Sequence, residues 1–247
     1  MKKSNFQIIR ESELEAALAH FPPGCRVLEL GGGTGWQAQL LSERGFLVSS
    51  VDVELHAPAD TFFPVQLYDG VHLPFGDDSF DVVFSSNVME HVQDRGGLLK
   101  EVSRVCVQGG VALHILPNPW WRLATLLGFY PYKAKRVLAQ LLSKSSSSDT
   151  RGVPSHAYLG EKPFRHKFLY DAPHGEFSSA LAELWYFSAF FWRKELAQSG
   201  MTLVDVRMVG GYAYQGYSDL NTASLACRAA WPRALGRPCT MYVLRKN

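Results

Sequence analysis

The chain has 247 residues, of which 47% are hydrophobic and 19% charged, and its formal net charge is +2 at pH 7. This length and composition indicate one large domain or a core domain with an insertion. The near-neutral charge argues against a nucleic-acid partner, which would favour a clustered basic face. Four scattered cysteines without a Cys-x-x-Cys pair argue against a zinc site and a disulfide framework, and favour reduced thiols.

The sequence also favours a cytoplasmic protein. Residues 1–15 are of mixed charge and lack the apolar core of a secretory signal. No run of about 18 uncharged apolar residues occurs, so we expect no membrane-spanning helix.

The first 117 residues alternate strand-like and helix-like segments. Helices are expected over residues 11–20, 35–44 and 97–105, and strands over 27–30, 46–53, 65–68, 80–85 and 111–116. A strand-helix alternation at this spacing predicts a parallel sheet covered by helices on both faces.

The character of the sequence changes after Pro119. Residues 120–144 are apolar and basic, four consecutive serines follow at 145–148, and residues 151–178 have no clear period. We interpret 118–185 as an inserted substrate-recognition or lid region between the core segments 1–117 and 186–247. A helix over 188–199 and strands over 201–209 and 241–245 complete the predicted core.

The most informative stretch is Glu29–Gly35, where a short apolar run ends in an acidic residue and a glycine-dense turn follows. Glycines allow a sharp turn and leave no Cβ to block a ligand. The helix that follows presents unpaired N–H groups to the turn. This pattern predicts a nucleotide-type cofactor loop, and Asp52 after the second strand suits the hydroxyl groups of a ribose.

Three later features distinguish between cofactors. Asp69 follows the third strand, Leu73–Asp81 leads into Val82–Val92, and Glu101 is followed by Arg104-Val105 and Gly109-Gly110. This ordered set closely resembles the class I S-adenosylmethionine-dependent methyltransferases of the small-molecule type. The likeness covers about Arg26 to Leu116, and a weaker one continues over Trp192–Val206.

The resemblance implies an α/β, Rossmann-like, doubly wound sheet of seven strands, mostly parallel with an antiparallel last strand. It also implies methyl transfer from S-adenosylmethionine by in-line displacement. The resemblance places Glu29, Gly31, Gly33 and Gly35 in the methionine-binding loop. Asp52 would bind the ribose, and Asp69 and Gly70 the adenine. Ser86 and Asn87 would lie under the methionine.

The charge of Glu29 agrees with this cofactor. A carboxylate in the loop would repel a pyrophosphate but tolerate the ammonium group of S-adenosylmethionine. A nicotinamide-dependent oxidoreductase on a similar fold is the first alternative. A catalytically inactive methyltransferase-like partner subunit is the second.

The residues that assist the chemistry are less evident. Candidate bases are His91, His156, His166, His174 and Glu176. The last four lie in the segment that is expected to cover the substrate. The sequence separations between the three histidines of the insertion do not match a zinc pattern, so no metal is predicted.

The substrate is expected to be a small molecule, or a glycan-type or lipid-type acceptor. Residues 120–144 would form a lid, a helix packed on the sheet, or a peripheral contact with an anionic membrane. The acceptor, the methylated atom and the oligomeric state stay open at this point.

Overall fold

The computed structural model describes residues 5–125, 174–179, 181–210 and 236–247. The strands are β1 (Arg26–Leu30), β2 (Leu47–Asp52), β3 (Gln66–Leu67), β4 (Phe80–Ser86), β5 (Cys106–Pro117), β6 (Thr202–Val209) and β7 (Cys239–Arg245). The helices are α1 (Asn5–Leu18), α2 (Trp36–Glu43), α3 (Arg95–Val105), α6 (Ala182–Tyr186) and α7 (Ala189–Leu196), with short 3-10 helices η1 (Pro58–Asp60), η2 (Met89–His91) and η3 (Ala197–Ser199).

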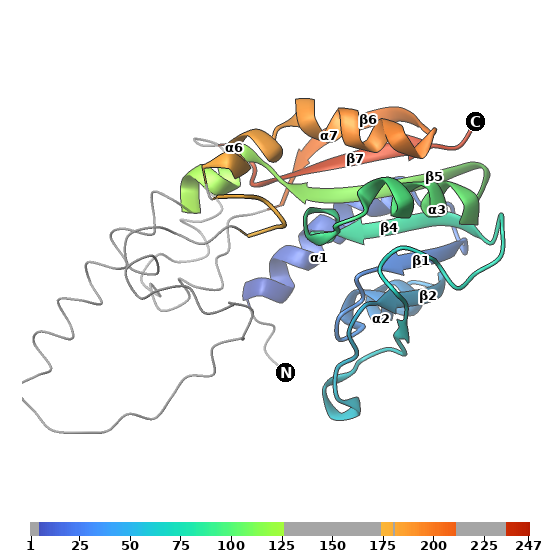
Figure 1. The fold of residues 1–247 in the computed structure, drawn as a ribbon. Coiled ribbons are helices and arrows are strands. Elements are labelled where there is room, and N and C mark those ends of the chain that lie inside the picture. The colour runs from blue at the N-terminus through green and yellow to red at the C-terminus, as the bar shows by residue number, and fades with distance from the viewer. Residues whose placement is uncertain (1–4, 126–173, 180, 211–235) are drawn as a thin grey trace, which may run out of the picture.

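The seven strands form one sheet in the order β3-β2-β1-β4-β5-β7-β6 (Figure 1). Strands β1 to β5 pair in parallel, and β7 pairs antiparallel with both β5 and β6. The α/β class, the doubly wound sheet and the antiparallel last strand are therefore confirmed.

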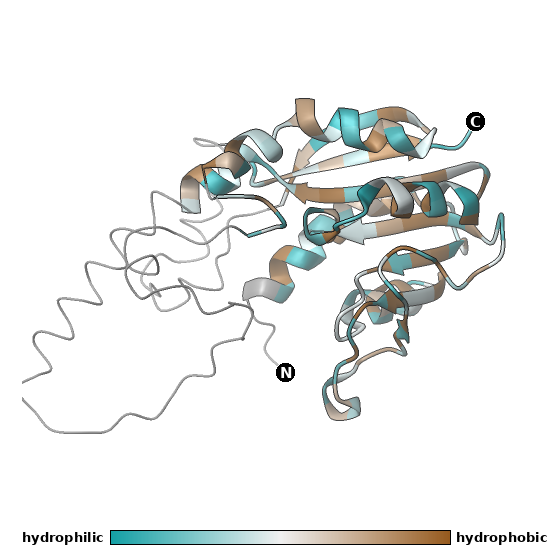
Figure 2. Ribbon diagram, viewed as in Figure 1, coloured by the Kyte–Doolittle hydropathy of each residue, from teal (hydrophilic) through white to brown (hydrophobic). Residues whose placement is uncertain are grey.

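Two apolar cores lie on opposite faces of the sheet, and successive strand residues alternate between them. In β4, Val82 and Phe84 belong to the core shared with α1 and α2, whereas Val83 belongs to the core shared with α3 and α7. Figure 1 shows α3 and α7 on one face, and the central strands are largely hydrophobic in Figure 2. Burial on both faces explains why these strands read as continuous apolar runs.

The helix and strand ends differ from the predictions for identifiable reasons. Helix α3 begins at Arg95 because the Asp94 side chain accepts the N–H of Gly97 and caps the helix. Gly109 and Gly110 form an irregularity within β5 rather than a turn before it, with Gly109 at φ +75°. Helix α1 starts at Asn5 and ends at Leu18, and is longer than the predicted segment.

Among the described residues, no helix has the length and apolar character required to cross a bilayer. The three described cysteines, Cys25, Cys106 and Cys239, are buried and unbridged. Cys227 lies outside the described residues.

A buried ion pair joins the segment after β5 to helix α6. The side chains of Arg122 and Glu183 are 1% and 0% exposed, and Arg122 Nε lies 3.0 Å from Glu183 Oε2. The other oxygen, Glu183 Oε1, accepts the N–H groups of His174 and Gly175. One carboxylate therefore holds three segments of the chain together.

We expect Glu183→Ala to lower the free energy of unfolding by about 3–5 kcal/mol, because the variant leaves the Arg122 guanidinium buried without this carboxylate. Urea denaturation measures the change. The double variant Arg122→Met/Glu183→Leu should lose less, because it removes both charges. A loss below about 1 kcal/mol for Glu183→Ala would contradict the structural role of the pair.

Candidate functional site

The glycine turn lies where β1, β2 and β4 end. A Cβ on Gly31 would lie 2.3 Å from the Val88 side chain, and one on Gly32 would lie 2.0 Å from Ser50 Oγ. Gly31 also has φ +73°, in the left-handed region that favours glycine. Gly33, by contrast, faces open space. The turn is thus packed against the sheet on one side and leaves its backbone accessible at Gly33.

Glu29 lies beneath the turn and is 2% exposed. Its Oε2 accepts a 2.6 Å hydrogen bond from Ser50 Oγ on β2. Burial raises the pKa of the Glu29 carboxyl to about 7, against the opposing effect of that hydrogen bond. A cationic group above the turn would favour the charged form of this carboxylate.

Asp52 ends β2 and fixes the turn from the side. Asp52 Oδ2 accepts the N–H of Gly33 at 2.7 Å, and Oδ1 accepts the N–H of Val53 at 2.7 Å. Oδ1 also accepts the N–H of Glu54 at 3.3 Å, so the acceptor capacity left for a hydroxyl group lies on Oδ2. Asp52 therefore joins the glycine turn to the neighbouring strand and still offers a polar edge.

Asp69 and Gly70 lie beside this edge, after β3. A Cβ on Gly70 would be 3.4 Å from the Val53 side chain, which places the two strand ends together. The Asp69 carboxylate accepts the N–H groups of Val71 and His72 and contacts His72 Nδ1 at 2.7 Å. The His72 hydrogen bond lowers the pKa of Asp69 to about 2. Asp69 thus forms its own turn, and its contact with adenine stays a prediction.

Ser86 and Asn87 end β4 opposite the glycine turn. Asn87 has φ +56°, donates its N–H to the carbonyl of Ile115, and donates from Nδ2 to Ser86 Oγ at 3.2 Å. Ser86 Oγ also accepts a 3.0 Å hydrogen bond from Arg10 on α1. The nine residues predicted to hold a cofactor therefore gather at the carboxyl edge of β1 to β4 and the start of α2.

A cavity of about 400 Å³ lies next to Gly33. The connection between β2 and β3 supplies the rest of its lining, namely Leu55, His56, Pro58, Thr61, Phe62, Phe63, Pro64 and Val65. This volume lies in the range of ligand pockets, roughly 300–1,000 Å³. Sequence reasoning missed these residues, because no motif marks them.

Several of the most recognisable motif residues support the fold. The Arg104 guanidinium contacts the carboxylates of Glu101 and Asp77 and donates to the carbonyls of Leu73 and Phe75. It therefore fixes the loop before β4 from helix α3. In the same way, Arg26 on β1 binds Asp81 on β4 through its backbone and side chain.

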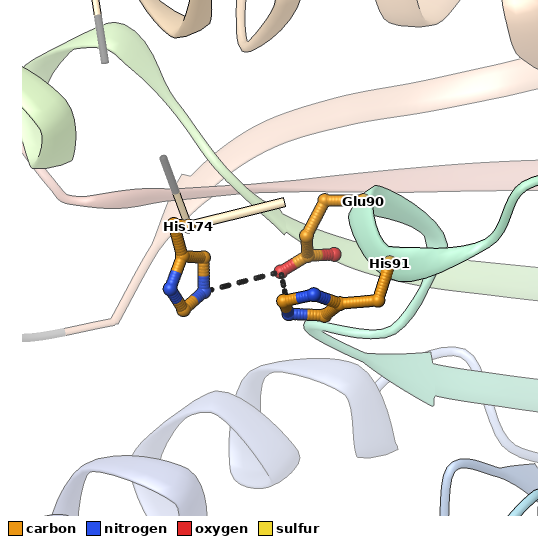
Figure 3. Close-up of side chains that lie close together, drawn as sticks. All are labelled: Glu90, His91 and His174. Atoms are coloured by element: carbon orange, nitrogen blue, oxygen red, sulfur yellow. Dashed lines mark ion pairs between the residues drawn. The ribbon is translucent and has the colours of Figure 1, made fainter. Parts of the chain in front are cut away.

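Figure 3 shows that Glu90 and His91 on η2 lie close to His174. Glu90 Oε1 is 3.9 Å from His91 Nε2 and 3.9 Å from His174 Nε2, and the two rings lie edge to face with centroids 4.9 Å apart. The structure thus brings together two of the predicted candidates, His91 and His174, although they lie far apart in the sequence.

Burial controls the charge of this cluster. It raises the pKa of Glu90 to about 8, lowers that of His91, and lowers that of His174 to about 3, with further effects from nearby charges. Both imidazoles are therefore neutral at pH 7, and in this state they are able to accept a proton or bind a cation.

The remaining candidates are placed differently. Glu176 is exposed, and its N–H donates to the carbonyl of Glu90. His156 and His166 lie outside the described residues. Trp121, one of the two tryptophans of the expected lid, packs against His174 with ring centroids 4.7 Å apart.

Sequence reasoning missed two charged pairs that surround the cluster. Arg10 and Glu13 on α1 are 2.8 Å apart, and Glu13 is 1% exposed. The second pair is Arg122 and Glu183. No sequence pattern marks Glu13, whose burial is seen only in the structure.

Residues 28–114 match the family model of the methyltransferase domain. An uncharacterised methyltransferase of Mycobacterium sp. strain KMS is 39% identical over 104 residues, which are 40% of this chain and 41% of that protein. A demethylmenaquinone methyltransferase of Corynebacterium urealyticum is 30% identical over 56% of this chain and 60% of its own length. A ubiquinone/menaquinone biosynthesis C-methyltransferase of Xanthomonas campestris is 30% identical over 61% and 63%. The chain thus matches less than two thirds of the length of each.

Solved structures share the fold. An S-adenosylmethionine-dependent methyltransferase of Mesorhizobium loti matches with a TM-score of 0.54 at 17% identity, over 95% of this chain and 97% of that one. One of Aquifex aeolicus matches with a TM-score of 0.54 at 12% identity, over 100% and 94%. The match to the methyltransferase domain covers the glycine turn, Asp52 and the β4 end, and the solved structures show that the fold is shared.

Proposed function

We propose that this chain transfers a methyl group from S-adenosylmethionine to a small-molecule acceptor. The observation that carries the proposal is the junction of the glycine turn with Asp52, within the segment that matches the family. Gly33 faces open space beside Asp52 Oδ2, so a ligand has access both to the backbone of the turn and to a carboxylate edge.

The residues at this edge suit the cofactor. Asp52 would accept hydrogen bonds from the ribose hydroxyls, and the buried charge of Glu29 beneath Gly32 would favour the ammonium group. The same carboxylate would repel a pyrophosphate, which supports S-adenosylmethionine over a dinucleotide. Asp69 and Gly70 lie beside Val53, on the side where the adenine would extend.

When bound, S-adenosylmethionine supplies a methyl carbon on a sulfonium, which an acceptor atom attacks in line while the carbon–sulfur bond breaks. Because this methyl group is already activated, the protein mainly supplies proximity and alignment. Ser86 and Asn87 would form the floor on the acceptor side, with α1 and η2 next to them. The turn packed against Val88 keeps this floor and the cofactor loop in a fixed relation.

The acceptor is an aromatic or lipid-like small molecule. Two relatives carry names from quinone biosynthesis, which supports an aromatic acceptor of that kind. Aromatic rings lie next to η2 in this chain, where Trp121 packs against His174 and Phe187. Incubation with methyl-labelled cofactor and demethylated quinones tests this choice, and transfer to sugars alone would contradict it.

A thermal-shift experiment distinguishes a methyltransferase from a nicotinamide-dependent oxidoreductase and from an inactive partner subunit. S-adenosylhomocysteine at 100 times its Kd should stabilise the folded chain by about 2.7 kcal/mol, because it binds the native state alone. NAD should leave the Tm unchanged. Stabilisation by NAD would favour an oxidoreductase, and no response to either compound would favour an inactive partner subunit.

Asp52→Ala should weaken the binding of S-adenosylhomocysteine by more than about tenfold, because hydrogen bonds to a charged group contribute about 1.5–3 kcal/mol. Calorimetry measures the Kd. The matched control is Glu43→Ala, which removes an exposed carboxylate from helix α2. Equal affinities for the wild type and Asp52→Ala would exclude the proposed role.

Glu29→Gln should bind S-adenosylhomocysteine more weakly and yet be more stable than the wild type at pH 8. The pKa of Glu29 is about 7 in the folded chain, above the unfolded value of about 4.3, so the folded state holds the proton more tightly. The contribution of Glu29 to the free energy of unfolding therefore falls as pH rises from about 4.3 to about 7. Above about pH 7 this contribution no longer changes.

The difference in stability between the wild type and Glu29→Gln isolates this effect from other titrating groups. It should grow across that pH range and reach about 1–3 kcal/mol in favour of the variant. Urea denaturation at a series of pH values measures it. A variant that is less stable than the wild type at pH 8 would show that Glu29 is charged and compensated without a cofactor.

A further inference from the structure

Glu90, His91 and His174 bring three potential ligand atoms close together. These atoms all lie within 4.8 Å of one another, and Glu90 Oε1 is 3.9 Å from each of two Nε2 atoms. Figure 3 shows both rings turned toward the carboxylate. Two neutral imidazoles and one carboxylate are a donor set that binds divalent transition metals.

The Glu90 carboxylate is the group in this cluster that requires a partner. Its side chain is fully buried, and neither oxygen has a hydrogen-bond partner among the described residues. An isolated buried carboxylate is among the costliest groups in a folded protein. Such a group normally pairs with a cation or coordinates a metal.

The nearby protein cations are engaged elsewhere. Arg10 contacts Glu13 at 2.8 Å, and Arg122 contacts Glu183 at 3.0 Å, so each guanidinium already has a buried carboxylate. Glu90 is the third carboxylate beside two guanidinium groups. The site is therefore electrically balanced with a proton on Glu90, and a metal ion that replaces this proton would pair with the carboxylate.

The backbone holds the two halves of the cluster in place. The Glu176 N–H donates to the Glu90 carbonyl at 3.0 Å, and a Cβ on Gly175 would lie 2.5 Å from that oxygen. The Glu183 carboxylate accepts the N–H groups of His174 and Gly175. These bonds fix His174 beside η2, which is the rigid support that a metal site needs.

We propose that Glu90, His91 and His174 bind one divalent transition-metal ion of the zinc type. Ligand atoms around zinc are roughly 3.4 Å apart for bonds of about 2.1 Å. The two 3.9 Å separations therefore need a small contraction, and the two imidazoles, whose ligand atoms lie within 4.8 Å of each other, need a larger one. The histidine side chains are 45% and 38% exposed, which leaves an entry path for the ion. Three protein ligands leave an open position for water or an acceptor oxygen.

This proposal differs from the expectation that the chain has no metal site, and the binding itself does not depend on the proposed methyl transfer. A consequence for the chemistry does rest on the proposed function. An ion at this place would lower the pKa of a bound acceptor hydroxyl, so that the hydroxyl releases its proton to solvent water and the remaining oxyanion is the nucleophile. His91 and His174 would then act as ligands rather than as bases.

The test uses the tag-free full chain, stripped with EDTA and titrated with ZnCl₂ by calorimetry, with metal analysis after gel filtration. We expect one ion per chain, and CoCl₂ should give the visible absorption of a low-symmetry site. Glu90→Gln and His174→Ala should each weaken zinc binding by at least about 100-fold. Loss of a residue that only hydrogen-bonds to a ligand weakens metal binding by about 10–100-fold, so a larger effect indicates a direct ligand. The Tm of every variant in EDTA verifies that it folds.

The matched control is His20→Ala, since His20 Nε2 lies 3.6 Å from Asp205 in a histidine–carboxylate pair elsewhere in the fold. It should bind zinc like the wild type. Absence of zinc binding by the wild type, or equal binding by Glu90→Gln, would overturn the proposal, and Glu90 would then be a buried protonated carboxyl. S-adenosylhomocysteine binding is measured in the same samples, so that loss of the cofactor site and loss of the metal site are distinguished.

Discussion

The close approach of the Gly31–Gly33 backbone to the ends of β2 and β4 is the constraint on which the rest of the structure depends. Side chains at the first two positions would collide with Val88 and Ser50, so the turn exists in this form only with glycine. Asp52 then ties the third glycine to β2. One short segment thus aligns three strands and gives the carboxyl edge of the sheet its shape.

The fold was predictable to the extent that local chemistry determined it. Val27, Val82 and Val111 lie in apolar runs that are buried on both faces, and such runs mark central parallel strands. The ends were less predictable where side chains decide them. Asp94 starts α3 two residues before the predicted position, and Gly109 bends a continuous strand where a turn was expected.

The site was predictable where its residues follow strand ends, and less so where the fold joins distant segments. Glu29 and Asp52 were predictable because each is an acidic residue at the carboxyl end of an apolar strand. The neighbours Glu90 and His91 are visible as a pair, but their partner His174 comes from the segment that was expected to be an insertion. Nothing in the spacing of the histidines indicates this contact, because it depends on Glu183 and on the backbone of Glu176.

The position of β7 has a consequence for the order of assembly during synthesis. This strand lies between β5 and β6, and it pairs with both. Until residues 239–245 have left the ribosome, β5 presents an unpaired edge and β6 has no neighbour to join. Unpaired edges are templates for pairing with other chains. The strands β1 to β5 are therefore able to pair before synthesis ends, while the edge of β5 stays open to aggregation until β7 pairs with it.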